Sequence, residues 1–110
     1  MAALTPKTLY VGNTSAANVY TVASTTGNYT IVKNFTMTNA NTSTAKTISI
    51  YILNSGNTTA AENRIYISNL SIPANGVIQI DTSLILSNTH AIYVTHTGNV
   101  TLTVSGVEYA

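Results

Sequence analysis

The chain has 110 residues, 45% of them hydrophobic, which fits a single domain over residues 1–110 with one hydrophobic core. Only 6% of the residues are charged and the formal net charge is +1, which excludes a basic surface for nucleic acid and a charge-rich disordered chain. Thr, Asn and Ser together account for 43 residues, so neutral hydroxyl and amide groups must cover the surface. Such a surface repels neighbouring molecules only weakly.

The elements predicted from the sequence are short strands in which hydrophobic and polar residues alternate. Within residues 46–53, Ile48, Ile50 and Ile52 share one face, and residues 100–109 repeat the pattern. This period of two is typical of antiparallel strands with one buried and one solvent-exposed face. In chain order the predicted strands are 8–11, 18–23, 29–38, 46–53, 64–70, 76–80, 90–95 and 100–109.

Two segments interrupt this regular pattern. In residues 29–38, the face that holds Ile31, Phe35 and Met37 also holds Lys33. Either Lys33 lies near the sheet end with its ammonium in water, or a bulge turns it away from the core. The apolar run 84–86 is either a strand end or a buried loop.

Turn residues separate the strands at short intervals. Asn75-Gly76 and Gly98-Asn99 are predicted to be tight hairpin turns, because Gly and Asn tolerate a positive φ. Many short strands with such spacing predict an all-β antiparallel sandwich, with a jelly roll as the expected architecture and an immunoglobulin-like sandwich as the alternative.

The ionisable side chains are too few to predict a catalytic site. The acids are Glu62, Asp81 and Glu108, and no two of them are expected to face one cleft as a catalytic carboxylate pair would. His90 and His96 would need Asp81 as a third ligand to hold a metal ion. We therefore predict no catalytic, cofactor-binding or metal-binding residues and expect that the protein is not an enzyme.

Tyrosine is the one abundant aromatic residue, with seven Tyr against one Phe and no Trp. Tyr is enriched in protein interfaces, and its ring also suits sugar binding. The alternative is that most of these rings pack at the sheet margins with their hydroxyls outward. The residues concerned are Tyr10, Tyr20, Tyr29, Tyr51, Tyr66 and Tyr93.

Five stretches of the chain together resemble small bacteriophage virion proteins, and they are residues 20–23, 29–39, 46–52, 72–80 and 100–108. The resemblance implies a structural component of a phage virion, most of all a capsid decoration or cement protein. A tail, knob or fibre component is one alternative, and a carbohydrate-binding module is another. It also implies a protein made in the host cytoplasm, which agrees with the lack of an apolar signal segment at the N-terminus.

A virion component of this kind needs a surface for its partners, which would be the major capsid or tail protein and further copies of the chain in a trimer or another cyclic oligomer. No nucleic acid or membrane partner is expected, because no basic cluster and no apolar run of about 20 residues is present. We expect residues 1–7 to form an extended arm, because Pro6 opposes regular structure; a frayed terminus is the alternative. The predicted interface residues are Ala3, Leu4, Thr5, Pro6 and Lys7.

Overall fold

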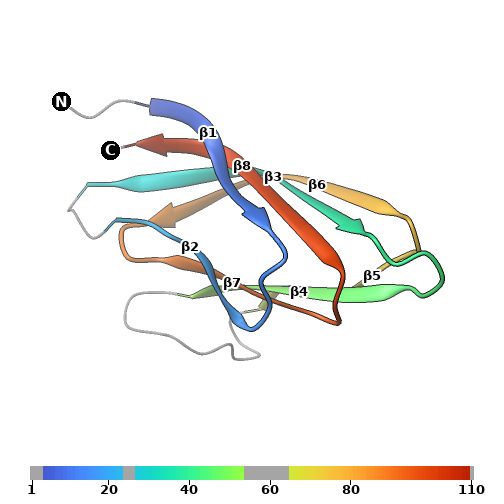
Figure 1. Cartoon of the computed structure of the whole chain (residues 1–110). Helices are drawn as coiled ribbons and strands as arrows, with labels where there is room; N and C mark the ends of the chain where they lie inside the picture. Colours follow the sequence, from blue (N-terminus) through green and yellow to red (C-terminus); the bar gives the residue numbers. More distant parts are fainter. Residues whose placement is uncertain (1–3, 24–26, 54–64, 110) are drawn as a thin grey trace.

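The computed structural model describes residues 4–23, 27–53 and 65–109. The regular secondary structure in these ranges is entirely β-strand, and the strands form two facing layers (Figure 1). The strands are β1 (Leu4–Gly12), β2 (Ala17–Thr21), β3 (Tyr29–Asn39), β4 (Lys46–Leu53), β5 (Ile65–Ile72), β6 (Val77–Ser87), β7 (Ala91–His96) and β8 (Val100–Tyr109).

The strand order is that of a jelly roll. One sheet, here called sheet A, has the order β1-β8-β3-β6, and the other, sheet B, has the order β2-β7-β4-β5. Within them β1 pairs with β8, β2 with β7, β3 with β6 and β4 with β5, always antiparallel, as if one long hairpin had been wound into two layers. The predicted jelly roll is confirmed. The immunoglobulin-like alternative is wrong, because there the first two strands share a sheet.

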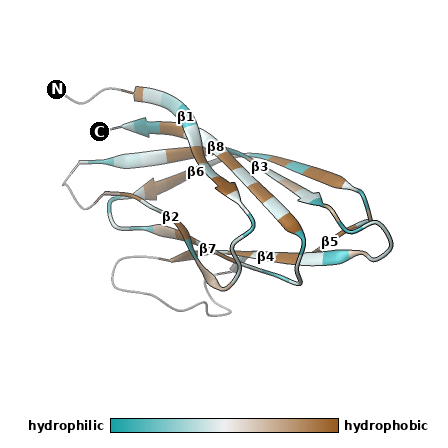
Figure 2. Cartoon of the chain, in the orientation of Figure 1, coloured by the Kyte–Doolittle hydropathy of each residue, from teal (hydrophilic) through white to brown (hydrophobic). Residues whose placement is uncertain are grey.

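The core lies between the two sheets and follows the alternation seen in the sequence. Figure 2 shows hydrophobic bands alternating with pale bands of intermediate hydropathy along β8. Val100, Leu102 and Val104 point inward from this strand and are at most 2% exposed. They meet Ile48 and Ile50 of β4, which are also buried. Burial of these branched side chains, at about 25 cal/mol per Å² of apolar surface, drives the two layers together.

A bulge in β3 resolves the conflict at Lys33. The register of β3 against both β6 and β8 shifts between Val32 and Asn34. Val32 is buried before the shift and Phe35 after it, whereas Lys33 is exposed and donates to Ser83 Oγ at 3.0 Å. The bulge interpretation is therefore correct. Its consequence is that Ile31 faces outward rather than into the core.

Two strands are longer than the sequence pattern predicted. Residues 84–86 are not a loop but part of β6, which continues to Ser87. β1 begins at Leu4 rather than Thr8 and contains Pro6, which lies opposite Val107 of β8. A proline is tolerated there because β1 is an edge strand, in which every second N–H has no partner strand.

The two predicted hairpin turns are turns, but they do not close hairpins. Asn75 (φ 58°), Gly98 (φ 111°) and Asn99 (φ 58°) all have a positive φ, as expected for tight turns. The strands on either side of each turn, however, lie in different sheets. In a jelly roll these turns carry the chain from sheet B to sheet A, so the hairpin prediction was wrong.

Candidate functional site

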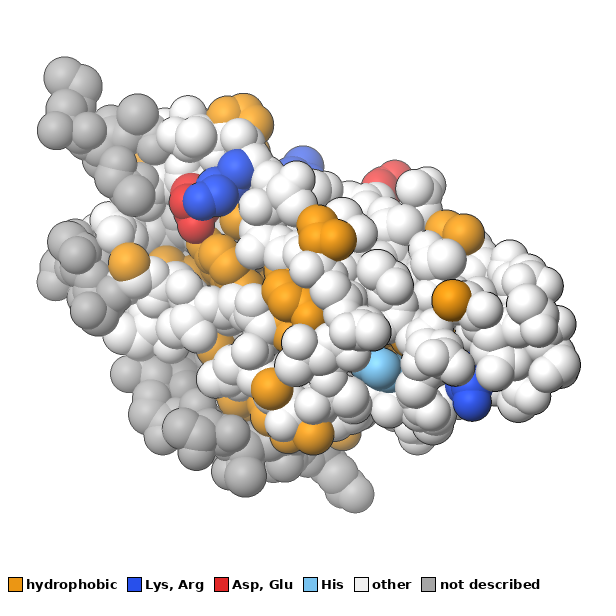
Figure 3. Space-filling view, viewed as in Figure 1, with side chains coloured by type: hydrophobic (Ala, Val, Ile, Leu, Met, Phe, Trp, Pro, Cys, Tyr) orange, Lys and Arg blue, Asp and Glu red, His pale blue; other side chains and the backbone are white. Residues whose placement is uncertain are grey.

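The predicted interface residues lie in an edge strand rather than in a free arm. Leu4, Thr5, Pro6 and Lys7 belong to β1 and pair with the last residues of β8, and Ala3 lies outside the described residues. The four described residues are nevertheless all exposed. The arm expected for residues 1–7 is thus wrong for residues 4–7, while their contact with a partner remains a prediction. Figure 3 shows few charged side chains in this view and hydrophobic ones exposed where the layers meet.

The structure does not bring the candidate catalytic residues together. Asp81 lies on the exposed side of β6 and accepts from Asn34 Nδ2 at 2.8 Å, whereas Glu108 lies at the end of β8 with other partners. Glu62 lies outside the described residues. In the described ranges no three His, Cys, Asp or Glu side chains are grouped so as to hold a metal ion. No helix in the described part of the chain is long and apolar enough to cross a membrane.

Both ring nitrogens of His96 make hydrogen bonds to loops. Its Nδ1 accepts the Gly98 N–H at 3.0 Å, and its Nε2 lies 2.8 Å from the Asn13 carbonyl oxygen. With Nδ1 as acceptor, Nε2 carries the hydrogen and donates it to Asn13. The imidazole thereby holds the β1–β2 loop against the β7–β8 turn.

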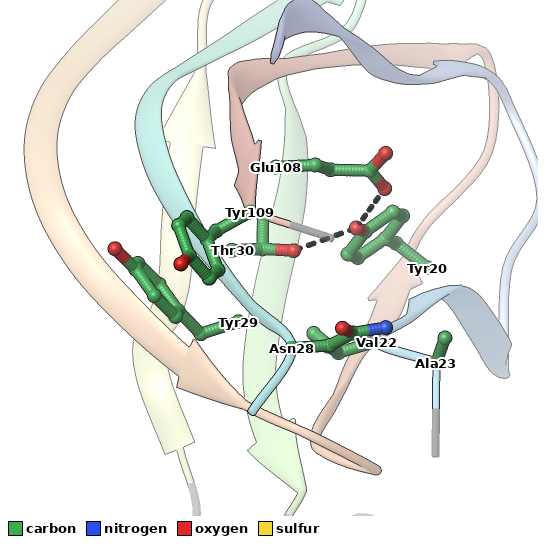
Figure 4. A pocket seen from close by; sticks show the side chains of 8 residues that line it. All are labelled: Tyr20, Val22, Ala23, Asn28, Tyr29, Thr30, Glu108 and Tyr109. Atoms are coloured by element: carbon green, nitrogen blue, oxygen red, sulfur yellow. Dashed lines mark hydrogen bonds between the residues drawn. The ribbon is translucent and has the colours of Figure 1, made fainter. Parts of the chain in front are cut away.

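A polar cluster closes the end of the sandwich where both chain termini lie (Figure 4). The Tyr20 hydroxyl of β2 reaches across to sheet A and donates to Glu108 Oε2. Thr30 Oγ1 lies 2.7 Å from the same hydroxyl and donates to it, because the Tyr20 hydrogen is already used. Lys7 Nζ lies 3.1 Å from Glu108 Oε1. The cluster thus joins β1, β2, β3 and β8.

These contacts shift the acidity of two groups in opposite directions. Burial, followed by the hydrogen bond to Glu108, raises the pKa of Tyr20 from 10.0 to about 12. The hydrogen bond from Tyr20 lowers the pKa of Glu108, and Lys7 adds to this, against the opposing effect of partial burial. At neutral pH the pair is a neutral phenol donating to a carboxylate, which is a strong charge-assisted hydrogen bond.

The hollow beside this cluster is too small for an organic ligand. Its volume is about 70 Å³, and Tyr20, Thr30 and Glu108 line it together with Tyr29 and Tyr109. Ligand sites for small molecules usually enclose about 300 Å³ or more. Because its polar groups also bond to one another, the cluster is a latch between the sheets rather than a binding site.

A second tyrosine bridges the sheets on the opposite side. Tyr66 of β5 places its hydroxyl 2.8 Å from Thr82 Oγ1 of β6, and its ring centre lies 6.0 Å from that of Phe35. The expectation of outward hydroxyls is therefore wrong for Tyr20 and Tyr66. Both hydroxyls bind the opposite sheet, because a strand at a sheet edge can reach past the apolar core.

The outer face of sheet A carries an apolar area that the alternating pattern does not predict. Two neighbouring rows of side chains cross the sheet at its terminal end, and the strand registers align them. One row has Leu4 of β1, Tyr109 of β8 and Tyr29 of β3; the other has Pro6, Val107, Ile31 and Ile85 of β6. We call these seven residues the outer patch.

The residues of the outer patch are exposed or half-buried. Leu4 is 59% and Ile85 62% exposed. The rings of Tyr29 and Tyr109 are stacked, with centres 4.9 Å apart and planes at 14° (Figure 4). A shallow hollow runs along Tyr29, Ile31 and Ile85.

The other end of the same face is polar. Its rows contain Ser105, Asn34 and Asp81, then Thr103, Thr36 and Gln79. Val11 and Val77 are exposed there as single apolar residues, which is ordinary for a protein surface.

Of the seven residues of the outer patch, only Leu4 and Pro6 are among the interface residues predicted from the sequence. A signal for the other five was present in the spacing. Tyr29 and Ile31, and likewise Val107 and Tyr109, are two residues apart and so share a face, while the run 84–86 is apolar on both faces of its strand. The inward assignment of Ile31 hid this signal until the bulge was known.

The jelly roll is shared by viral capsid proteins, lectins and cupins, so the fold alone does not select a function. The functional candidate in the described part of the chain is thus a surface, the outer patch, rather than a pocket. No protein-family model, no curated protein and no solved structure matches this chain.

Proposed function

We propose that the protein is a structural component of a phage virion and serves as a capsid decoration or cement protein. The observation that carries the proposal is the outer patch, an apolar area on an otherwise neutral and polar domain. The largest exposed apolar area of a protein is often a functional contact surface. The work of such a domain is to be assembled, not to transform a substrate.

The chemistry of the polar residues supports an assembly role over a catalytic one. Glu108, Tyr20 and Thr30 satisfy one another, and His96 is engaged by two loops. General acid–base catalysis requires a group that is free to meet a substrate proton. In the described residues these groups instead stabilise the fold.

A domain with this surface is suited to a capsid shell that carries many copies of it. Each contact made by a small apolar area is modest, but many copies on one particle add their contacts through avidity. The small number of charged groups also lets identical copies approach one another at high local concentration. The same reasoning applies to a tail or fibre component, which remains the alternative placement.

Immunogold labelling tests this proposal. An antibody raised against the chain is applied to purified particles from its source, with particles lacking this reading frame as the control. We expect label distributed over the shell. Label confined to a tail or vertex would replace decoration by the tail, knob or fibre alternative.

Absence of label on intact particles, with the protein abundant in the lysate, would contradict the virion proposal. The carbohydrate-binding module would then become the leading function. That alternative predicts saturable heat of binding in calorimetry with one member of a glycan panel.

A further inference from the structure

We propose that the outer patch packs against the outer patch of a second copy of this chain, giving a two-fold symmetric dimer. The inference rests on the proposed function only in taking this patch as the surface of assembly. It names the partner that covers the patch. A contact in which both copies use the same surface is isologous, and it closes as a dimer.

The arrangement of the patch favours a sheet face as the contact. One of its rows runs across β1, β8, β3 and β6 for the full width of sheet A and the other across β1, β8 and β3, so the apolar side chains form a broad surface rather than a ridge. Two such sheets stack face to face with a layer of interdigitated side chains about 10 Å thick. The inner faces of this protein pack in the same way.

Pairing through the edge of the sheet is less favourable than pairing through its face. The edge strand next to the patch contains Pro6, which has no N–H to donate, and Lys7, and its register shifts between Thr8 and Tyr10. Proline, lysine and bulges are the features that prevent edge strands from adding a further strand. The partner therefore approaches over the face of sheet A.

The charges on this face suit a second copy. Beside the patch lie one cation, Lys33, and one anion, Asp81, and neither forms an ion pair within the described residues. Two copies bring together two charges of each sign, so the joined faces have no net charge. An acidic or basic partner would gain nothing from this balance, whereas an identical face is complementary to it.

The size of the face indicates a dimer of moderate affinity. Seven residues on strands about 4.8 Å apart, in rows about 7 Å apart, give the patch a footprint of about 240 Å². A stable interface needs roughly 800 Å² from each partner. The polar half of the face, with its Thr, Ser, Asn and Gln residues, must therefore form the rim around the apolar centre, as in other interfaces.

Sedimentation equilibrium tests the inference with matched variants on the same face. Ile85→Lys places a charge in the patch, and Val77→Lys places the same charge on the same strand and face but outside the patch, at a residue of similar exposure (57% against 62%). We expect wild type and Val77→Lys to dimerise at about 10–100 µM, and Ile85→Lys to bind at least about 30-fold more weakly. Circular dichroism establishes that both variants are folded.

A second pair of variants keeps the test decisive if Ile85→Lys does not fold. Leu4→Lys lies in the patch and Val11→Lys, on the same strand, lies outside it; both wild-type side chains are exposed. Only Leu4→Lys should weaken the dimer. A wild-type monomer at 100 µM, a trimer, or equal effects inside and outside the patch would overturn the inference.

Failure of the inference is separable from failure of the proposed function. A monomer that still labels the shell leaves the virion role standing and moves the patch to another partner. A dimer sensitive to Ile85→Lys but absent from particles supports the inference and contradicts the virion role.

Discussion

Asn39 shows how a single buried amide organises one end of the sandwich. It is 1% exposed, and its Nδ2 donates to the carbonyl oxygens of Thr44 and Ile72, each at 3.0 Å, with that of Pro73 at 3.2 Å. Its Oδ1 accepts the Asn41 N–H at 2.9 Å. One side chain thus fixes the loop after β3 and the turn after β5, at the end opposite the termini.

Replacing Asn39 by alanine should destabilise the protein strongly. The change leaves buried carbonyl groups without donors, and we expect a loss of about 2–4 kcal/mol in the free energy of unfolding. Urea unfolding followed by circular dichroism measures the loss. Asn18→Ala, on an exposed position of β2, is the control and should stay within about 0.5 kcal/mol of wild type. Equal effects of the two changes would contradict the role of Asn39.

The Tyr20–Glu108 latch should make stability depend on pH at both ends of the scale. The raised pKa of Tyr20 means that its contribution is complete below pH 10 and is lost as the pH rises from 10.0 to about 12. The lowered pKa of Glu108 means that its contribution is present above its ordinary value of 4.5 and is lost as the pH falls below it.

Comparison of wild type with Tyr20→Phe tests this latch. We expect wild type to be the more stable protein between pH 5 and 9, with the difference shrinking towards pH 12 and again below pH 4.5. Thermal unfolding across this pH range measures the difference. A difference that does not vary with pH would show that the hydroxyl acts without Glu108.

At the scale of the element, the bulge in β3 determines which residues face the core. Before it Thr30 and Val32 point inward, and after it Phe35 and Met37 do. The alternation of the sequence located this strand but not the shift, because a pattern of period two does not reveal where one extra residue is placed. The charged Lys33, on a face of apolar residues, was the local indication of this shift.

Deleting Lys33 should therefore be far less harmful than deleting Thr36 from the same strand. Without Lys33 the bulge is lost, but Val32 and Phe35 are then two residues apart and still share the inner face. Without Thr36 the bulge remains and Met37 turns away from the core. We expect the Lys33 deletion variant to fold and the Thr36 deletion variant not to fold, and circular dichroism with denaturant unfolding separates the two results. The opposite order would contradict the role assigned to the bulge.

Gly106 of β8 lies beside this bulge and has no room for a side chain. A Cβ at this position would clash with the Ile31 carbonyl oxygen and lie 3.1 Å from Val32 Cα. Because both contacts are with backbone, Gly106→Ala should lower the free energy of unfolding by about 1–3 kcal/mol. Gly98→Ala is not a matched control, since its φ of 111° adds strain of another kind. Stability unchanged in urea unfolding of Gly106→Ala would argue against this close approach.

At the scale of the whole molecule, strand content followed from the sequence but the details of pairing did not. Alternation within residues such as 100–109 predicted strands and a sandwich, because that pattern is local. The pairing of β1 with β8 joins the two ends of the chain, and no local pattern encodes it. For the same reason the turns at Asn75 and Asn99 were correctly placed but assigned to hairpins.

The outer patch depends on this long-range pairing. Leu4, Ile31, Ile85 and Tyr109 come from four strands and become neighbours only when the strand registers of sheet A are set. In the sequence each is one apolar residue among many threonines. Leu4 was predicted to be an interface residue because it lies in the arm expected near the terminus. The pairing of β1 with β8 does not support that arm.

The most direct test of the account is hydroxyl-radical footprinting of the unmodified protein at about 1 µM and at 100 µM. We propose that the working protein is assembled through the outer face of sheet A. We therefore expect oxidation of Tyr29, Tyr109 and Ile85 to fall on concentration, while Tyr51 and Tyr93, which pack edge to face on sheet B, react equally at both concentrations. Protection of Tyr51 and Tyr93, or of neither pair, would contradict it.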